Sequence, residues 1–452
     1  MMRDFGARKV MNIIDYILAM IIIMNCNTVF EKSVNINFHL QEAGCVLVYV
    51  AVFMSIVLFG LDQSTVFKCF KWIRVMIWYI PVAVLYFIAR YGIMAKGIYI
   101  RLFLIFFPGI LLYVYLERKP RQMNLYKAIS DIMVIEGGLS ALIWIFSNII
   151  GILHANGSIL VNWGGERLYE SFFDLQYQIA WQSIKIFGLT GYRNIGFFCE
   201  APMLSLMLTF ALIYELFFRN IDKSNKKPRF EIVNGKIFIN KGYIPSVKII
   251  ILVLSNITTF SATGYILMIV AFILKFAQNG KKKGLNIIKK LAFPVIIVSA
   301  GVLIYIVWNQ KADSAQWLTR FDDYIVGILA WRSNKICGVG FGNMEALIPY
   351  MSAFRSSNTG ISSGFFTVLA QGGILLTIIY LIPLVGSILS ASTQKDRNMC
   401  AFMILSMVEF VVTYFPYTFF MLLILAYGYM VIDSAPQSSA KTIVVRKTLL
   451  NR

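Results

Sequence analysis

The chain has 452 residues, of which 58% are hydrophobic and only 14% are charged, whereas about 25% of an ordinary globular protein is charged. So few charges cannot cover the surface of two or three soluble domains, and the composition indicates a protein that lipid surrounds. The net charge of +20 does not indicate nucleic-acid binding, because the basic residues gather in alternate loops between apolar stretches.

Twelve apolar stretches predict an all-α polytopic membrane protein, with a single membrane domain over 1–452. In chain order they cover residues 11–30, 44–61, 75–93, 98–116, 129–153, 201–218, 249–260, 264–276, 291–308, 364–389, 399–415 and 417–432. The stretches at 249–260 and 264–276 are either two short spans joined by Ser261–Ala262–Thr263 or one long tilted helix. Two spans are required if Lys248 and Lys281–Lys283 lie on the same side of the membrane.

Every second loop is rich in lysine and arginine, most clearly the loop at 219–248 and the tail at 434–452. Basic loops face the cytoplasm in membrane proteins. The alternation therefore predicts about twelve transmembrane helices with both termini in the cytoplasm.

Two large loops, at 154–200 and 309–363, fall on the opposite, extracytoplasmic side. Within the first, the segment Glu170–Phe187 interleaves aromatic and polar residues. It predicts an amphipathic helix, either in the membrane interface with Tyr177 and Trp181 at headgroup depth, or packed outside the membrane. Two such loops over a membrane domain are typical of enzymes that act on lipid-linked substrates.

No metal or cofactor is expected from the sequence. The six cysteines have no metal-binding spacing, and there are only two histidines. No Walker loop or dinucleotide fingerprint is present either.

Arginines in the two large loops are the candidate catalytic or binding residues. A guanidinium is always charged and binds phosphate oxygens in a bidentate manner, which suits a departing diphosphate. Arg193 lies at the predicted bilayer boundary, where the alternative is an interfacial snorkelling residue. The other candidates from the second loop are Arg320, Arg332 and Arg355.

Glu200 begins the sixth predicted span and is a candidate base for an acceptor hydroxyl. The alternatives are a helix N-terminal carboxylate or an ion pair with Arg193. Asp322 and Asp323 are weaker candidates, either solvated or paired with Arg320. A glycine-rich turn follows them, and its backbone amides are candidate donors to a phosphate; its glycines are Gly338, Gly340 and Gly342.

The order of these motifs resembles the superfamily of Wzy-type polysaccharide repeat-unit polymerases and O-antigen ligases. The pieces are Arg193-Asn194-Ile195-Gly196-Phe197-Phe198-Cys199-Glu200-Ala201-Pro202, Ser261-Ala262-Thr263-Gly264-Tyr265, Trp331-Arg332, Cys337-Gly338-Val339-Gly340-Phe341-Gly342 and Ser356-Ser357-Asn358. The resemblance covers about residues 185–385. It implies substrate-binding roles for Trp331 and Asn358.

Two departures favour a polymerase over a ligase within this family. Ser357 stands where ligases carry a histidine, and Gly264 stands where an arginine is expected. The resemblance implies an enzyme of the bacterial cytoplasmic membrane that joins polyprenyl-diphosphate-linked oligosaccharide repeat units. It also implies a flippase and a chain-length regulator as partners, besides the lipid bilayer.

Acidic residues within the predicted spans support competing functions. Such groups often mark ion pathways, and they are Asp15, Glu136, Glu215 and Glu409. A proton- or sodium-coupled flippase for lipid-linked oligosaccharides would also have about twelve spans. A channel or scaffold is a further alternative, without a repeat or a pore pattern to support it.

Overall fold

The computed structural model describes residues 2–117, 123–186, 189–219, 230–233, 236–239, 247–278, 315–355 and 359–434. The predicted span at 291–308, most of the basic loop at 219–248 and nearly all of the tail at 434–452 lie outside the described residues, as does Asn358.

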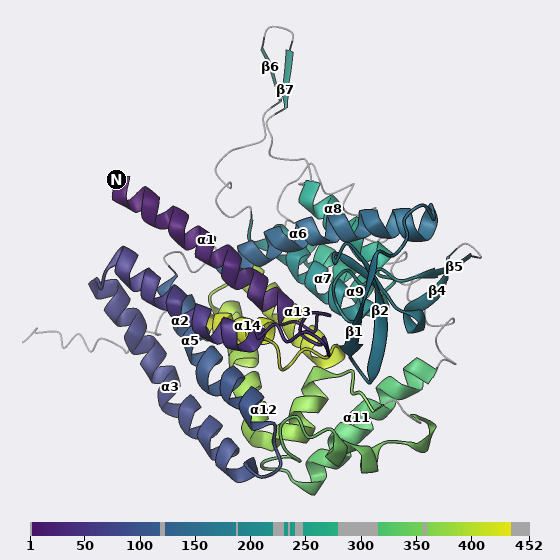
Figure 1. The fold of residues 1–452 in the computed structure, drawn as a ribbon. Coiled ribbons are helices and arrows are strands. Elements are labelled where there is room, and N and C mark those ends of the chain that lie inside the picture. Colours follow the sequence, from purple (N-terminus) through teal and green to yellow (C-terminus); the bar gives the residue numbers. More distant parts are fainter. Residues whose placement is uncertain are drawn as a thin grey trace, which may run out of the picture.

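Helices make up most of the described chain (Figure 1). They are α1 (Met2–Met24), α2 (Leu40–Phe59), α3 (Gln63–Arg90), α4 (Lys96–Tyr99), α5 (Phe107–Leu116), α6 (Asn124–Trp144), α7 (Ala201–Phe217), α8 (Val247–Thr258), α9 (Ala262–Gln278), α11 (Ala315–Ser333), α12 (Gly364–Thr393), α13 (Arg397–Val412) and α14 (Phe419–Ser434). A π-helical turn, η1 (Ile100–Phe106), joins α4 to α5, and another, η3 (Ile145–Ile149), extends α6.

Among the described residues, 5 helices are long and apolar enough to cross a membrane. They are α2, α3, the continuous unit Lys96–Leu116, α6 with its extension, and α12; α7, α8, α9 and α14 are apolar but shorter. The prediction of a largely helical membrane protein is therefore confirmed.

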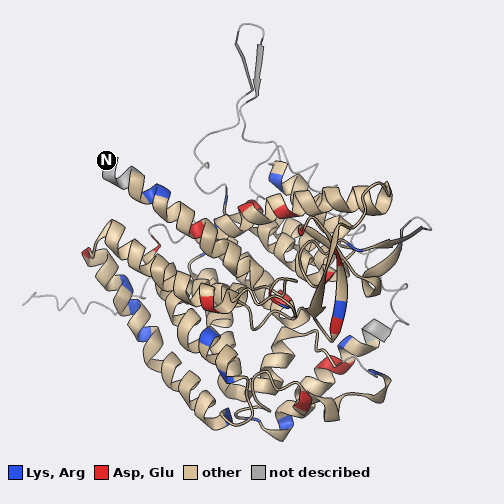
Figure 2. Ribbon diagram, in the orientation of Figure 1, with Lys and Arg blue, Asp and Glu red and all other residues tan. Residues whose placement is uncertain are grey.

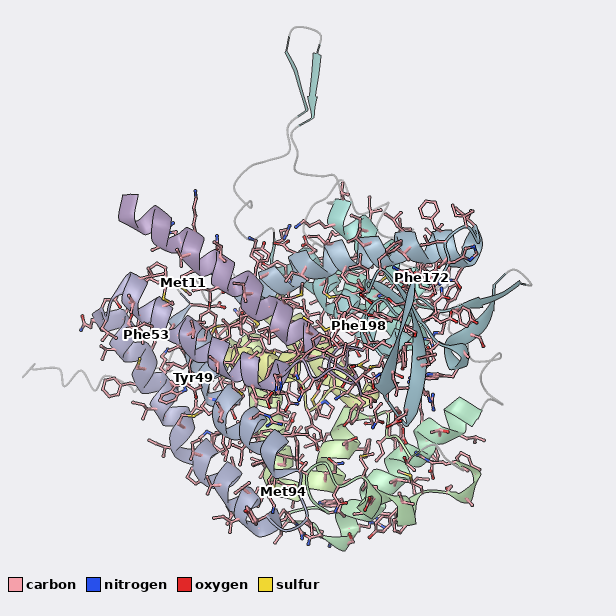
Figure 3. All side chains as sticks on the ribbon, viewed as in Figure 1. Met11, Tyr49, Phe53, Met94, Phe172 and Phe198 are labelled. Atoms are coloured by element: carbon pink, nitrogen blue, oxygen red, sulfur yellow. The ribbon has the colours of Figure 1, made fainter. Side chains whose placement is uncertain are left out.

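The helices sort into an inner and an outer set. In α14 every residue from Phe419 to Val431 is buried, and α7 is buried almost throughout. A helix that is apolar and buried on all sides belongs to a core. By contrast, α2 and α3 expose large apolar side chains such as Phe53 and Ile77, which is the surface expected toward lipid (Figure 3).

Two helices, α8 and α9, occupy the region that the sequence left open between one long helix and two short ones. Thr259–Ser261 separates them, and Phe260 has a φ of 49°. The Thr259 hydroxyl donates to the carbonyl oxygen of Asn256 at 2.7 Å, which helps to end α8. The region is two helices.

Charged residues are sparse on the helices (Figure 2), and several meet at one end of the bundle. Near the start of α6, Asp131 accepts hydrogen bonds from Arg219 and Lys248. Arg74 of α3 pairs with Asp433 at the end of α14. Residues of different predicted cytoplasmic loops thus lie at the same end, away from the loop at 154–200.

The helix predicted for Glu170–Phe187 is wrong, because this segment forms strands. The chain holds a three-stranded antiparallel sheet of β1 (Gly157–Asn162), β2 (Glu166–Phe172) and β3 (Gln176–Gln178), and two hairpins, β4 (Ser183–Ile186) with β5 (Leu189–Tyr192) and β6 (Phe230–Val233) with β7 (Lys236–Ile239). The strands β1 to β5 lie together beside α7 and α9, at the right of Figure 1.

Burial along β2 explains why a strand forms there. Tyr169 and Ser171 are buried, whereas Leu168 and Glu170 between them are exposed, which is the two-residue period of a half-buried strand. Tyr177 is fully buried and donates to Asp174 at 2.9 Å. It does not lie on an exposed interfacial surface, whereas Trp181 is 41% exposed.

Candidate functional site

Arg193 follows β5 and is held over the turn between α8 and α9. Its Nε donates to the carbonyl oxygen of Thr259 at 2.9 Å. The next residue, Asn194, fixes the loop to the same turn, because its backbone N–H and its side-chain amide both donate to Thr258. Burial lowers the pKa of Arg193 to about 10, opposed by the nearby charge of Glu200, so Arg193 stays cationic at neutral pH.

A tight turn at Gly196 carries the chain from Arg193 toward Glu200. Gly196 has a φ of 54°, and a Cβ there would collide with the Glu136 carboxyl of α6. Both carboxyl oxygens of Glu136 are buried without a hydrogen-bond partner among the described side chains. Only glycine combines this backbone conformation with this close approach.

Glu200 precedes α7, but its side chain makes no hydrogen bond to the start of that helix. The carboxylate instead interacts with Trp163, from the end of β1, and with the charges of Arg193 and Arg320. Burial raises the pKa of Glu200, although the two arginines and Trp163 oppose the rise. A carboxylate with a raised pKa is suited to accepting and returning a proton near neutral pH.

Arg320 comes from α11, far from Arg193 in the sequence. Its Nη1 lies 3.3 Å from the hydroxyl of Thr263, at the start of α9. Its charge acts on Glu200, on Arg193 and on Glu409 of α13. The structure therefore brings together Arg193, Glu200 and Arg320, which the sequence analysis proposed separately.

Beside Arg320, an apolar pocket of about 320 Å³ opens between α9, α11 and α13. It is lined by Thr263, Ile266, Leu267, Val270, Arg320, Phe321, Tyr324, Ile404, Leu405, Val408 and Val412. Of these, only Arg320 carries a charge. The pocket has the chemistry to hold a hydrocarbon chain whose anionic end meets a guanidinium.

The helix α11 also carries an exposed apolar stripe. Four large side chains at helical spacing point outward along it, namely Leu318, Phe321, Ile325 and Leu329. A helix with such a stripe next to a membrane domain is suited to lie in the membrane interface. The sequence analysis expected this kind of helix at 170–187, and α11 has the pattern instead.

Arg355 is engaged inside the second loop rather than in the pocket. The structure corrects the predicted partner of the two aspartates: Asp322 and Asp323 pair with Arg355, not with Arg320. The guanidinium also donates to the carbonyl oxygens of Gly360 and Thr319, each at 3.0 Å. Its donors are therefore taken up by the loop itself.

The two aspartates respond differently to this pairing. Burial alone would raise the pKa of Asp322, but hydrogen bonds from Ser352 and Arg355 outweigh it and lower that pKa. For Asp323, which is fully buried, burial prevails over the bonds from Ser362 and Arg355 and raises the pKa. Arg355, Asp322 and Asp323 together hold the start of α11 against the Ser362 turn.

The glycine-rich turn forms hydrogen bonds with the backbone at a break in α12, so its amides are not available to a ligand. The break lies at Gly373, which has non-helical backbone angles. Val339 and Gly340 donate their N–H groups to the carbonyl oxygens of Ala370 and Gln371. The remaining glycine amides are engaged as well: Gly338 donates to Asn334 and Gly342 to the Gln371 side chain.

Trp331 and Arg332 lie at the far end of α11. Twelve residues of helix separate Arg332 from Arg320, which corresponds to about 18 Å. Arg332 is exposed, and the Trp331 indole donates to the carbonyl oxygen of Lys335 at 3.1 Å. The structure does not bring this pair to Arg193 and Glu200.

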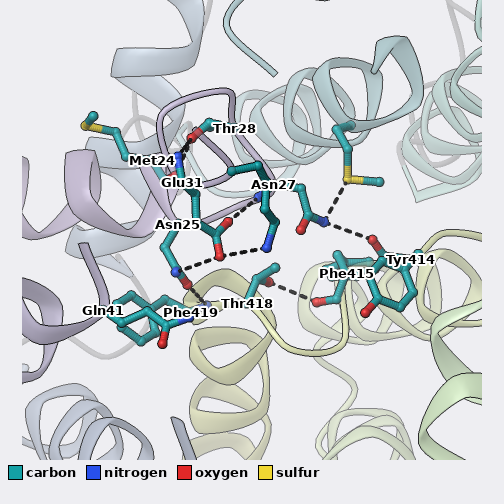
Figure 4. A network of polar contacts seen from close by, with 12 residues as sticks. Met24, Asn25, Asn27, Thr28, Glu31, Gln41, Tyr414, Phe415, Thr418 and Phe419 are labelled. Carbon is teal, nitrogen blue, oxygen red and sulfur yellow. Dashed lines mark hydrogen bonds and ion pairs between the residues drawn. The ribbon is translucent and has the colours of Figure 1, made fainter. Parts of the chain in front are cut away.

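The segment after α1 supplies residues that the sequence analysis did not select. The Glu31 carboxylate accepts from the Asn25 side chain, from the Asn27 backbone and from Lys32 (Figure 4). Asn27 also donates to the Tyr414 carbonyl oxygen at 3.1 Å. The network ties α1 to the turn between α13 and α14.

Lys32 is thereby held next to the loop that ends in Glu200. Burial alone would lower the pKa of Lys32, but the Glu31 carboxylate raises it, with smaller contributions from Tyr414 and Cys199. Backbone bonds join the two segments, since Val29 donates to Phe197 and Cys199 donates to Asn27. The sequence feature that could have identified Lys32 is its position as a lysine in a predicted extracytoplasmic loop.

Trp163 and Glu409 are the other site residues that sequence reasoning missed or assigned elsewhere. The Trp163 ring lies 6.2 Å from the Tyr414 ring, centroid to centroid. From the sequence, Glu409 is one of four acids within predicted spans and supports the competing transport function, because nothing in the sequence places α13 beside Arg320. In the described part of the chain, no group of histidine, cysteine and acidic side chains is arranged to hold a metal ion.

No protein-family model matches this chain, and no curated protein is detectably similar to it.

Proposed function

We propose that this chain is a multi-pass membrane glycosyltransferase that polymerises polyprenyl-diphosphate-linked oligosaccharide repeat units. It would have about twelve spans and cytoplasmic termini, and would act at the outer face of a bacterial cytoplasmic membrane. The single observation that carries the proposal is the position of Arg320. This cation stands at an otherwise apolar pocket and acts on the same carboxylate, Glu200, as Arg193 does. The resemblance to Wzy-type polymerases supplies the substrate class.

In this mechanism the pocket takes the prenyl chain of the donor, and Arg320 and Arg193 face its diphosphate. Glu200 accepts the proton of the acceptor hydroxyl as that oxygen attacks the anomeric carbon of the donor glycan. The bond from that carbon to the diphosphate oxygen breaks, and polyprenyl diphosphate leaves with the electron pair. Arginines that stabilise this developing charge lower the barrier, and no nucleotide takes part.

Three features favour this function over a coupled flippase. The arginines Arg193 and Arg320 converge on one carboxylate at the end of the bundle that carries the large loops. The exposed apolar stripe of α11 suits an enzyme whose substrate arrives laterally from the bilayer. The backbone groups at the α12 break are bonded to the glycine-rich turn, whereas broken helices in transporters aim such groups at an ion.

The test is the fate of the lipid-linked glycan after deletion of the gene in its host. Loss of a polymerase leaves single repeat units on the outer face and no ladder of longer chains. Single units trapped in the inner leaflet would mean a flippase, and long chains left on the lipid carrier would mean a ligase. An unchanged ladder would refute the family assignment.

Complementation with variants tests the site itself. Arg193→Ala and Arg320→Ala should each shorten the chains, and Arg332→Ala, on the same helix but about 18 Å away, is the matched control. Full chain length in both Arg193→Ala and Arg320→Ala, at normal expression, would refute the proposed mechanism.

A further inference from the structure

Glu409 is a carboxylate placed within the membrane part of the protein, on the pocket side of α13. Only 1% of its surface is exposed. Its neighbours on the same helical face are Leu405 and Val412, four residues before and three after it, and both line the apolar pocket. One carboxylate oxygen accepts a hydrogen bond from the Thr413 hydroxyl at 2.9 Å. No ion pair within 4.0 Å joins Glu409 to a described basic residue.

Arg320 is the cation whose charge acts on Glu409. It lines the same pocket from the other side, on α11. A buried carboxylate without a cation nearby is strongly disfavoured, and so is a guanidinium at an apolar pocket. Each of the two residues therefore offsets part of the cost of burying the other.

The segment that leads into α12 attaches α11 to α13, the two helices that carry these charges. Ser362 bonds to Asp323 of α11, and the next residue, Ser363, donates to the Val411 carbonyl oxygen of α13. Gly364 then donates to the carbonyl oxygen of Thr413 at 3.1 Å. The C-terminal end of α13 is thereby attached to the helix that carries Arg320.

We infer that Glu409 is the resident counterion of Arg320, and that the anionic headgroup of a lipid in the pocket takes its place. The inference rests on the proposed function in that the lipid is a prenyl diphosphate. Glu409 balances the charge of Arg320 before the lipid binds, and the bound diphosphate then becomes the nearer partner of the guanidinium. Glu409 also favours release of the diphosphate product, because its negative charge repels the ligand.

This role predicts an effect opposite to that of a structural residue. Loss of a carboxylate that competes with the ligand strengthens binding of an anion, whereas loss of a residue that only supports Arg320 weakens it. The binding affinity of a neutral lipid with the same chain should not depend on the charge of Glu409. The sign of the change therefore separates the two roles.

The experiment measures binding to the full chain in phosphatidylcholine nanodiscs. Farnesyl diphosphate is the anionic probe and farnesol is the neutral one. Glu409→Gln should lower the Kd for farnesyl diphosphate by about five- to tenfold, a size typical of one nearby charge, and leave the Kd for farnesol unchanged. Glu409→Ala, which also removes the carboxylate, should change binding in the same direction.

Glu117→Gln is the matched control, because Glu117 is a buried carboxylate that bonds to Tyr427 of α14. It should leave both Kd values unchanged. Unchanged or weaker binding of farnesyl diphosphate in folded Glu409→Gln and Glu409→Ala would overturn the inference. If, in that case, Arg320→Gln binds farnesyl diphosphate more weakly than the wild type does, the proposed anion site stands and only the counterion role fails. If Arg320→Gln binds both probes like the wild type, the proposed site and the counterion role both fail.

Discussion

Replacement of Arg355 by leucine should destabilise the second large loop more than any other single arginine substitution among the described loop residues. The guanidinium has only 2% of its surface exposed and pairs with Asp322 and Asp323, which are 5% and 0% exposed. Loss of the cation leaves two adjacent buried carboxylates without their partner. Breaking a buried ion pair in this way costs about 3–5 kcal/mol, and the lost bonds to Thr319 and Gly360 add to it.

The assay is the thermal stability of the purified protein in detergent, together with limited proteolysis of the loop. Arg355→Leu should lower the melting temperature and open the 315–363 region to protease. Arg332→Leu is the control, because Arg332 is exposed on α11, the helix that carries the two aspartates, and its loss should be nearly neutral. The triple variant Arg355→Leu, Asp322→Asn, Asp323→Asn should recover part of the stability, since it leaves no unpaired charge. Equal stability of Arg355→Leu and Arg332→Leu would refute this account of the loop.

Four further outcomes are expected. The pH dependence of glycan transfer should show an acid limb above the usual glutamate range, because Glu200 has a raised pKa and becomes protonated as the pH falls. Glu200→Gln should abolish most activity at every pH. A normal pH–rate profile in that variant would exclude Glu200 as the base. Trp163→Phe removes a group that lowers the pKa of Glu200, so the acid limb of its pH–rate profile should move to higher pH, and an unmoved limb would contradict that contact. Gly196→Ala should cost roughly 1–3 kcal/mol of stability through its backbone strain and its clash with Glu136, as measured by thermal melting. Gly164→Ala, at a similar φ of 63° but with open space around it, should cost less. Gly373→Ala should disrupt the α12 break, because a Cβ there would lie 2.5 Å from the Gly338 nitrogen; a protein as stable as the wild type would show that the turn can move away.

The membrane helices could be predicted from the sequence because lipid imposes one strong rule. A backbone within the bilayer must satisfy its own hydrogen bonds, so long apolar stretches become helices. The stretch at 364–389, for example, lies within α12. An apolar and aromatic segment outside the lipid is under no such constraint. The alternation of buried and exposed residues around Tyr169 and Ser171 was hard to recognise, because aromatic residues are interleaved with polar ones throughout Glu170–Phe187. That segment formed strands because β1 was available to pair with it.

The candidate site was predictable in its residue types but not in its grouping. Arg193 and Glu200 are close in the sequence, so their proximity could be expected. Arg320 joins them because α11 is a helix that packs against α12 and brings the Arg320 guanidinium to the Thr263 hydroxyl of α9, whereas the sequence predicts only a large loop for this region. The helical rise along α11 places Arg332 about 18 Å from Arg320, and therefore outside the site. Arg355 pairs with Asp322 and Asp323, and the sequence gives no sign of that pairing.

The contrast between two groups of charged residues, one buried and one half-buried, supports Arg193, Glu200 and Arg320 as the candidate functional set. In the group of Arg355, Asp322 and Asp323, bonds within the loop engage the guanidinium and both carboxylates, and nothing is left for a ligand. The other group is different. The charges of both arginines act on Glu200, yet among the described residues no ion pair within 4.0 Å joins Glu200 to either of them. Charges held near one another without contact leave room between them for the polar atoms of a ligand, and the apolar pocket beside Arg320 has the chemistry that the proposed lipid-linked substrate would require.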